Sequence, residues 1–343
     1  MAFLLNTSFS GSSSPNFNLS ESAFNTSSGG YLWWNNSNSK FVFCGSSDFS
    51  SYLPTPPSYD LEYLVVAGGG GGGPGSGDGG GGAGGYRSSV IGESSGGGST
   101  AESTICIQDN TAWTVTVGSG GSVFTNGDDS TLTNGTCTIT SDGGGAGGDW
   151  GPWNVGRAGC SGGSGGGGSS GWSSSPGGGA HTADQGCPGA PGSTWSSFSD
   201  RDYNSGGGGA AGNTGCSATP HKSGNGGDGL QSSITGTPTY YAGGGGGGIY
   251  AEGSPGSVGV GGQGGGGTGA GGGAGMSSGQ SGIQSSGGVN TGGGGGAGCT
   301  GGSGIVIVRY CGSSACATGG TISTSGPHIV HTFTESGYFT PTL

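Results

Sequence analysis

The sequence predicts a mostly irregular and β-rich fold with nearly no α-helix: a packed sandwich of polyglycine II helices that is clamped by β-strands. Three observations support this fold class. Glycine supplies 97 of the 343 residues and occurs in contiguous blocks. Hydrophobic residues make up only 28%, too few to fill a conventional core in a chain of this length. Two apolar β-type segments, residues 59–67 and 304–310, lie on either side of the glycine blocks.

Contiguous glycine favours packing between backbones. A six-residue segment with three residues per turn and a rise of about 3.1 Å spans roughly 19 Å and makes no internal hydrogen bonds. Its N–H and C=O groups therefore need outside partners, and no Cβ holds neighbouring helices apart. Collagen is excluded because it requires a strict G-x-y repeat with abundant proline, and this chain has 14 prolines. The main blocks are 68–73, 79–85, 143–148, 162–168, 206–209, 243–248, 261–267, 271–275 and 292–298.

A disordered low-complexity chain is the alternative interpretation of this composition. The chain carries 7 Trp, 11 Tyr and 11 Phe, which flexible linkers rarely contain. Its net charge of −12 is small for its length, so self-repulsion does not hold it open. We therefore expect an ordered structure.

Composition divides the chain into three parts. Residues 1–58 form a β-rich attachment region, residues 59–310 a glycine-rich domain with display loops, and residues 311–343 a C-terminal β segment. The strands at 59–67 and 304–310 are expected to pair and close the glycine-rich domain. Within it, residues 103–108 and 112–117 are candidates for a further strand pair, which gives Trp113 a packing role.

The charge balance excludes several function classes. Six Lys and Arg residues are too few to neutralise nucleic-acid phosphates or to bind anionic membranes. No apolar run reaches the roughly 20 residues of a membrane span.

No G-K-[ST] motif occurs, and no cofactor is expected. Catalysis is not expected either, although Asp200 and Asp202 form the one loop pair of carboxylates that suits a polysaccharide depolymerase.

Nine cysteines occur without C-x-x-C spacing, so no metal site is expected. Disulfides would stabilise long loops that have few apolar contacts. Cys311 and Cys316 are the local candidate pair, and the alternative is that all the thiols are reduced and buried.

Several phrases resemble the glycine-rich domain that is common in phage tail-fibre and other structural proteins. The resemblance covers roughly residues 59–340, and in tail-tip adhesins of T-even-like phages such a domain is a sandwich of polyglycine II helices whose loops bind the host. It implies a virion surface protein, on a tail or surface fibre and extracellular after release. The implied partners are a bacterial surface receptor (a glycan or an outer-membrane protein) and other virion tail or fibre proteins. The phrases are DLEYLVVAGGGGGG (60–73), TAWTVTVGSGG (111–121), GTPTYYAGGGGGG (236–248) and GGSGIVIVRY (301–310).

Aromatic and polar residues in the connecting loops are the candidates for receptor binding. Aromatic side chains supply contact area at low entropic cost, and binding residues concentrate on loops. Capping the ends of the glycine helices is an equally good role for each of them. The candidates are Trp150, Trp153, Trp172, Trp195, Phe198, Arg201, Tyr203, Tyr240, Tyr241 and Tyr250.

A self-assembling subunit of an extracellular or capsid-surface fibre is the alternative function. In that case the terminal strand expected at 329–334 would complete the sheet of a neighbouring copy.

Overall fold

The computed structural model describes residues 31–35, 40–44, 58–151, 155–172, 175–194, 202–252, 255–274 and 282–343. The chain forms two units, residues 1–55 and 56–343. In the first, β1 (Tyr31–Asn35) pairs with β2 (Lys40–Cys44) in antiparallel register. No α-helix occurs among the described residues, and the one helical turn there is the 3₁₀ segment Gly96–Gly98. The expected β and irregular fold class is confirmed.

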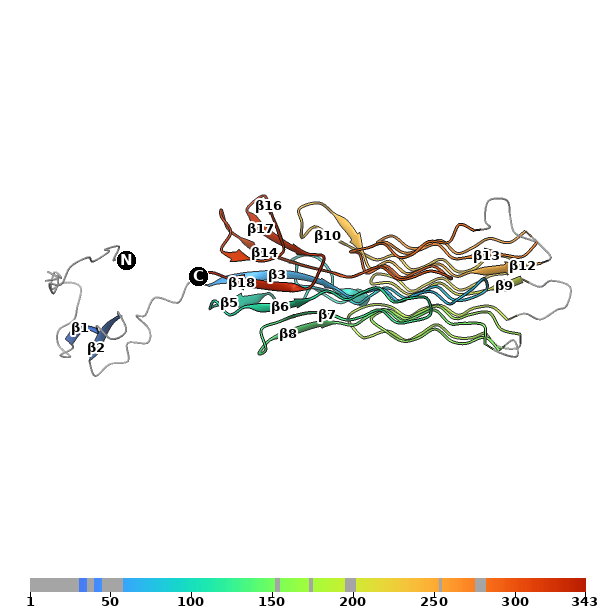
Figure 1. Cartoon of the computed structure of the whole chain (residues 1–343), viewed down its shortest axis with the longest axis horizontal. Helices are drawn as coiled ribbons and strands as arrows, with labels where there is room; N and C mark the ends of the chain where they lie inside the picture. The colour runs from blue at the N-terminus through green and yellow to red at the C-terminus, as the bar shows by residue number, and fades with distance from the viewer. Residues whose placement is uncertain are drawn as a thin grey trace. The chain divides into compact units, whose positions relative to one another are not determined.

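Two β-sheets lie together at one end of the second unit (Figure 1). A six-stranded sheet has the order β16-β17-β14-β3-β4, with β5 paired to β3; a five-stranded sheet has the order β15-β18-β6-β7-β8. The first contains β3 (Tyr59–Val66), β4 (Tyr86–Ser88), β5 (Ile105–Ile107), β14 (Ile305–Cys311), β16 (Thr321–Ser325) and β17 (His328–Phe333). The second contains β6 (Trp113–Thr116), β7 (Ser130–Thr133), β8 (Thr138–Ser141), β15 (Ala317–Thr318) and β18 (Gly337–Pro341).

The expected pairing across the glycine-rich domain is present. Strand β3 pairs antiparallel with β14, so that Val66 lies opposite Ile305 and Glu62 opposite Arg309. An ion pair of 2.5 Å between Glu62 and Arg309 reinforces this register. Residues 311–343 add β15 to β18 to the same two sheets.

The expectation that residues 103–108 pair with residues 112–117 is wrong. Strand β5 pairs with β3, whereas β6 pairs with β18 and β7. The physical reason is core formation: β5 and β6 lie in different sheets, and both contribute side chains to the apolar cluster between those sheets. Trp113, only 3% exposed in that cluster, has the packing role expected of it.

The two faces of β3 and β14 pack against different partners. Tyr63, Val65 and Val308 face the five-stranded sheet in the first core cluster. Leu64 and Ile307 belong to a second cluster, which contains alanines of the glycine segments and side chains of the hairpin formed by β10 (Leu230–Ser232) and β11 (Thr239–Tyr241). The sheets therefore hold the start of the glycine bundle through ordinary apolar burial.

The glycine segments run from these sheets to the opposite end of the unit, where a small third sheet lies (Figure 1). Its strands are β9 (Asp202–Asn204), β12 (Ile249–Ala251) and β13 (Gly271–Gly272), in the order β13-β12-β9. We call this end of the second unit the distal end. Long glycine-rich segments that lie side by side thus connect the two ends of the second unit (Figure 1).

Lateral hydrogen bonds in the bundle follow a repeat of three residues. In block 79–85, residues that are three apart donate their N–H groups to carbonyl oxygens of the same neighbouring segment. Successive residues donate to different segments, and the N···O distances are 2.8 to 3.2 Å. The carbonyls of the block accept from three more segments. Blocks 68–73 and 243–248 show the same repeat. The six neighbours of block 79–85 are 142–148, 206–209, 292–295, 67–73, 164–167 and 243–248.

This repeat equals the three residues per turn of polyproline II geometry, and it differs from the alternation of a β-strand. Glycine is required because the segments are in backbone contact. A Cβ added at Gly79, Gly80, Gly81, Gly82 or Gly84 would lie 1.9 to 2.3 Å from a carbonyl oxygen of a neighbouring segment. Alanine is tolerated where a Cβ points into an apolar cluster, as at the fully buried Ala83.

Candidate functional site

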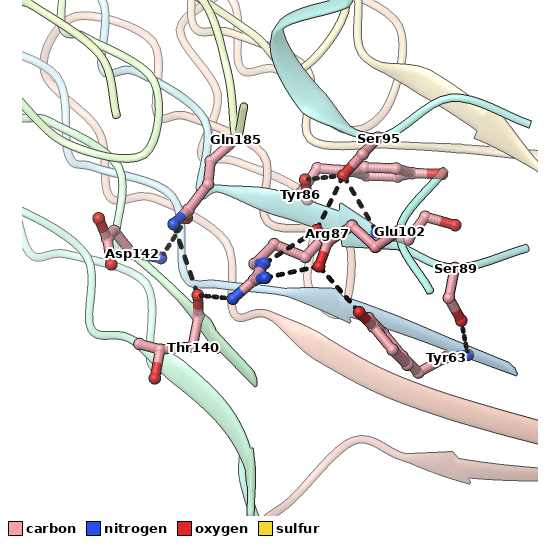
Figure 2. Close-up of polar contacts among 10 residues, drawn as sticks. Tyr63, Tyr86, Arg87, Ser89, Ser95, Glu102, Thr140, Asp142 and Gln185 are labelled. Atoms are coloured by element: carbon pink, nitrogen blue, oxygen red, sulfur yellow. Dashed lines mark hydrogen bonds and ion pairs between the residues drawn. The ribbon is translucent and has the colours of Figure 1, made fainter. Parts of the chain in front are cut away.

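A network of polar side chains surrounds the ion pair between Arg87 of β4 and Glu102 (Figure 2). The guanidinium donates from Nε to Oε1 at 2.9 Å and from Nη2 to Oε2 at 2.5 Å. The Tyr63 hydroxyl donates to Oε2 at 2.8 Å, and the Ser95 hydroxyl donates to Oε1 at 3.2 Å. Arg87 also reaches the carbonyl of Thr140 in β8 at 3.2 Å. Each oxygen of Glu102 therefore accepts two hydrogen bonds.

These bonds shift the pKa values of Arg87 and Tyr63. The hydrogen bonds that Arg87 donates to Glu102 raise the pKa of its guanidinium above the usual value. Burial, and then the bond to Glu102, raise the pKa of Tyr63 well above its usual range. Because the pair joins β3, β4 and β8 and has no free acceptor, we assign it a structural role. The sequence pattern gave no indication of it, since Arg87 and Glu102 lie 15 residues apart in different segments.

An open cavity of about 680 Å³ lies beside this network, and its walls include Arg87, Glu102 and Gln185. Gln185 accepts a hydrogen bond from the N–H of Asp142 at 2.8 Å and donates to the carbonyl of Thr140 at 3.4 Å (Figure 2). The side chains of Arg87, Glu102 and Gln185 thus already form hydrogen bonds within the protein.

Three of the predicted aromatic residues meet at the distal end. The ring centroids of Trp150 and Tyr203 are 4.4 Å apart, and those of Tyr203 and Tyr250 are 5.8 Å apart. Tyr203 is 8% exposed, whereas Trp150 and Tyr250 are partly exposed. Tyr203 therefore anchors the cluster from β9, and its two neighbours present the accessible surface. We call these three residues the distal aromatic cluster.

Asp78 holds the base of the distal aromatic cluster. It is 4% exposed, and its carboxylate accepts from the N–H of Gly75 and from that of Trp150, each at 2.7 Å. Burial raises the pKa of Asp78 to about 7, because desolvation outweighs the two backbone hydrogen bonds. The sequence does contain a signal for this residue: Asp78 is the one charged residue in the short connection between blocks 68–73 and 79–85.

Trp172 is the most exposed of the described predicted residues, with 42% of its surface accessible. The neighbouring Gly171 bridges to Thr194, and Ser170 bonds to Gly77 in the connection that carries Asp78, so Trp172 also lies at the distal end. Four predicted residues lie outside the described residues: Trp153, Trp195, Phe198 and Arg201.

Tyr240 and Tyr241 lie on β11, away from the distal aromatic cluster. Tyr241 is 5% exposed and packs in the second core cluster with Leu64 of β3. Tyr240 is 39% exposed and lines a second open cavity. The alternation of the strand separates the two side chains, so one packs in the core and the other is accessible.

The structure describes one member of the carboxylate pair named for an alternative enzyme. Asp202 is 8% exposed and pairs with His221 through Oδ2. Asp200 lies outside the described residues. Strand β9 therefore holds Asp202 against His221, whose side chain is 38% exposed.

Eight described cysteines are free thiols, including Cys311 and Cys316. The disulfide expected between these two is not formed. Cys311 is exposed at the end of β14, whereas Cys316 packs against the core cluster between the sheets, where its N–H donates to the Tyr310 hydroxyl at 3.0 Å.

Within the described ranges, no three His, Cys, Asp or Glu side chains are grouped to hold a metal ion. A search of the same residues for a helix with the length and apolarity of a membrane span finds none.

Comparison with known families gives one match. The model of a family described as "Glycine-rich domain" matches residues 46–311, well over half of the chain. Neither the comparison with curated proteins nor that with solved structures gives a significant match. The match extends over the glycine bundle and the pair β3 and β14, which are the features that define the fold of the second unit. The chain belongs to the glycine-rich domain family.

Proposed function

We propose that this chain is a bacteriophage surface protein of the receptor-binding or tail-fibre type, which binds the host surface through the loops at the distal end of its glycine bundle. The bundle consists, in this proposal, of packed polyglycine II helices. The observation that carries the proposal is the arrangement of the second unit, in which a hydrogen-bonded bundle of backbone segments runs from two sheets at one end to the distal end (Figure 1). Accessible aromatic side chains lie at the distal end.

The bundle suits a display role because backbone hydrogen bonds supply most of the contacts between its segments. Most of its lateral hydrogen bonds join backbone to backbone, and most of the residues in close contact are glycines. Exposed loop residues such as Trp172 can therefore change without loss of these backbone contacts. Binding residues are commonly carried on loops above a rigid scaffold of this kind.

The distal aromatic cluster and Trp172 provide the contact surface. Trp150 and Tyr250 are partly exposed around the buried Tyr203, and Trp172 is exposed nearby. Aromatic residues held by packing lose little conformational entropy on binding. The partner in this proposal is a glycan or outer-membrane protein on a bacterial surface, with other virion tail or fibre proteins bound elsewhere on the chain.

Adsorption of the purified chain to bacterial cells tests the proposal. The variant Trp172→Ala should reduce binding at least about tenfold, as expected for loss of an aromatic contact. Tyr338→Ala is the matched control, because Tyr338 is 64% exposed on β18 among the sheets. Equal binding of both variants and the parent, or equal binding after exchange of all the distal loops, would contradict the proposal.

Self-assembly into a fibre is the second candidate, and the open edge of β16 favours it. Strand β16 is the last strand of its sheet, and residues 321–324 are exposed and uncharged. Unprotected strand edges of this kind pair readily with other strands. The donor-strand form expected from residues 329–334 would require β17 to leave its pairing with β14 on one side and with β16 on the other.

The variant Ile322→Lys tests this second candidate, since Ile322 is 45% exposed on β16. A charge on the edge should abolish self-association that depends on it. Ile91→Lys, at a residue that is 80% exposed, is the control. Sedimentation velocity over a range of concentrations distinguishes the outcomes: a parent chain that stays monomeric would rule out assembly through β16.

A further inference from the structure

The second open cavity has a volume of about 500 Å³ and lies beside the β10–β11 hairpin. We propose that it binds a neutral saccharide. The cavity is separate from the Arg87–Glu102 network and from the distal aromatic cluster, so this inference does not depend on the proposed role of the distal loops. Its volume falls in the usual range for small-ligand sites. The residues that carry the inference are Glu93, Asn213, Asp228, Gln231, Tyr240 and Gln263.

The walls of the cavity are held in place by backbone bonds. Strand β10 pairs with β11 so that Gln231 lies directly opposite Tyr240. The Asp228 carboxylate accepts from the N–H of Gln263 at 2.8 Å, and its backbone carbonyl accepts from the N–H of Asn213 at 3.1 Å. Four chain segments are therefore fixed relative to one another before a ligand arrives, which lowers the entropic cost of binding.

Three side-chain amides in the cavity make no hydrogen bond to any described residue: those of Asn213, Gln231 and Gln263. Each amide offers an acceptor oxygen and two donor hydrogens. Sugar hydroxyls also donate and accept at the same atom, so amides complement them. This observation favours a polyhydroxy ligand over an amine, because an ammonium group has donors only and would leave the amide N–H groups without partners.

Tyr240 supplies the aromatic surface. Its side chain is 39% exposed, and the neighbouring Tyr241 is buried in the core, so the strand that carries Tyr240 is anchored. An aromatic ring offers apolar contact to the C–H face of a sugar, and its hydroxyl offers a further hydrogen bond. One accessible ring beside amides and carboxylates thus combines apolar contact with hydrogen-bonding groups.

The charges in the cavity select against acidic sugars. Glu93 and Asp228 both line it, and no Lys or Arg is among its described walls. Glu93 already accepts from the N–H of Ser233 at 2.8 Å and from its hydroxyl at 2.6 Å, which holds the carboxylate at this position. A uronate, sialate or phosphate would face two carboxylates without a counter-charge. A neutral sugar instead gains charge-assisted hydrogen bonds from its hydroxyls.

Saturation-transfer NMR on the full chain tests the inference, with glucose, galactose, N-acetylglucosamine, maltose and lactose as probes. We expect at least one of these sugars to give saturation transfer, and glucuronic acid to give none. Tyr240→Ala and Gln231→Ala should each weaken binding about tenfold or more. Both residues are exposed, and circular dichroism verifies that the fold of each variant is retained.

Tyr338→Ala and Trp172→Ala are the controls, and both should bind the sugar as the parent does. Three outcomes would overturn the inference: no transfer to any neutral sugar at about 10 mM, where even weak sites are occupied; equal binding by Tyr240→Ala; or preference for the acidic sugar. If Trp172→Ala loses cell adsorption but keeps sugar binding, the distal proposal and this one are separated.

Discussion

A Cβ on Gly81 would lie 2.1 Å from the carbonyl oxygen of Gly70 in the neighbouring segment. The N–H of Gly81 donates instead to Gly295 at 2.8 Å, and its carbonyl accepts from Gly245 at 2.8 Å. Gly81 thus contacts three different segments through its backbone alone. The glycine content, the lateral backbone hydrogen bonds and the close packing of the segments therefore depend on one another. A test of one of these features is also a test of the other two.

Replacing a glycine inside the bundle should destabilise the protein strongly. We expect Gly81→Ala to lower the free energy of unfolding by about 3 kcal/mol or more, because neither backbone can move without breaking lateral bonds. Gly177→Ala is the matched control, since a Cβ there meets nothing within 4 Å. Its effect should stay within about 0.5 kcal/mol. Urea denaturation measures both, and equal effects at the two positions would contradict the packing described.

Loss of the Glu102 carboxylate should cost more stability than loss of an exposed partner. Glu102→Ala leaves Arg87 without its ion pair and Tyr63 without an acceptor, and we expect a loss of about 2 kcal/mol. Asp149→Ala breaks the pair with Arg157, whose side chain is 53% exposed, and should cost less than about 1 kcal/mol. Chemical denaturation compares the two; a smaller effect at Glu102 would show that its network contributes little.

His331 should make the protein less stable in mild acid. It is fully buried, its Nδ1 donates to the carbonyl of Gly319 at 2.7 Å, and its Nε2 accepts from the Tyr310 hydroxyl at 3.2 Å. Burial lowers the pKa of His331 below its usual value of 6.5. The unfolded chain therefore binds more protons below pH 6.5, and stability falls as pH falls through this value. Thermal unfolding from pH 7.5 to 5 should show a flatter pH dependence for His331→Gln than for the parent. Parallel curves would contradict this assignment.

Asp78 should have the opposite pH dependence. Its pKa is raised from 3.8 to about 7 in the folded protein, so the folded state binds more protons between these values. Stability therefore falls as pH rises from about 4 to about 7, by up to about 4 kcal/mol for this one group. Asp78→Asn mimics the protonated form and should remove this decline. The difference in melting temperature between parent and variant, measured at pH 4.5 and 7.5, checks it; a difference that does not change with pH would count against the raised pKa.

The sequence predicted the parts of the fold that depend on local composition. The apolar runs that became β3 and β14 flank the glycine blocks, and their pairing follows from that placement. The glycine blocks themselves have no side chains that could pack, so lateral backbone bonding was the available way to satisfy their polar groups. The pairing of strands that are distant in sequence was harder to predict. Strands β5 and β6 are adjacent in sequence, but each pairs with a distant strand in the core.

The candidate site was predicted in part. Trp150, Tyr203 and Tyr250 were all named from their loops, but nothing in their spacing indicated that the three rings meet. Their contact arises because the bundle places the ends of separate segments side by side. For the same reason Tyr240 and Tyr241 could not be separated into an accessible and a buried residue before the position of β11 was known.

Hydrogen exchange of the backbone amides, measured residue by residue by NMR, tests the central claim most directly. We predict slow exchange at every successive residue of blocks 79–85 and 243–248, because each N–H donates to a neighbouring segment. Protection at alternate residues would indicate an ordinary edge strand instead. Exchange at the rate of an unstructured chain throughout these blocks would contradict the account and remove the rigid platform on which the proposed function depends.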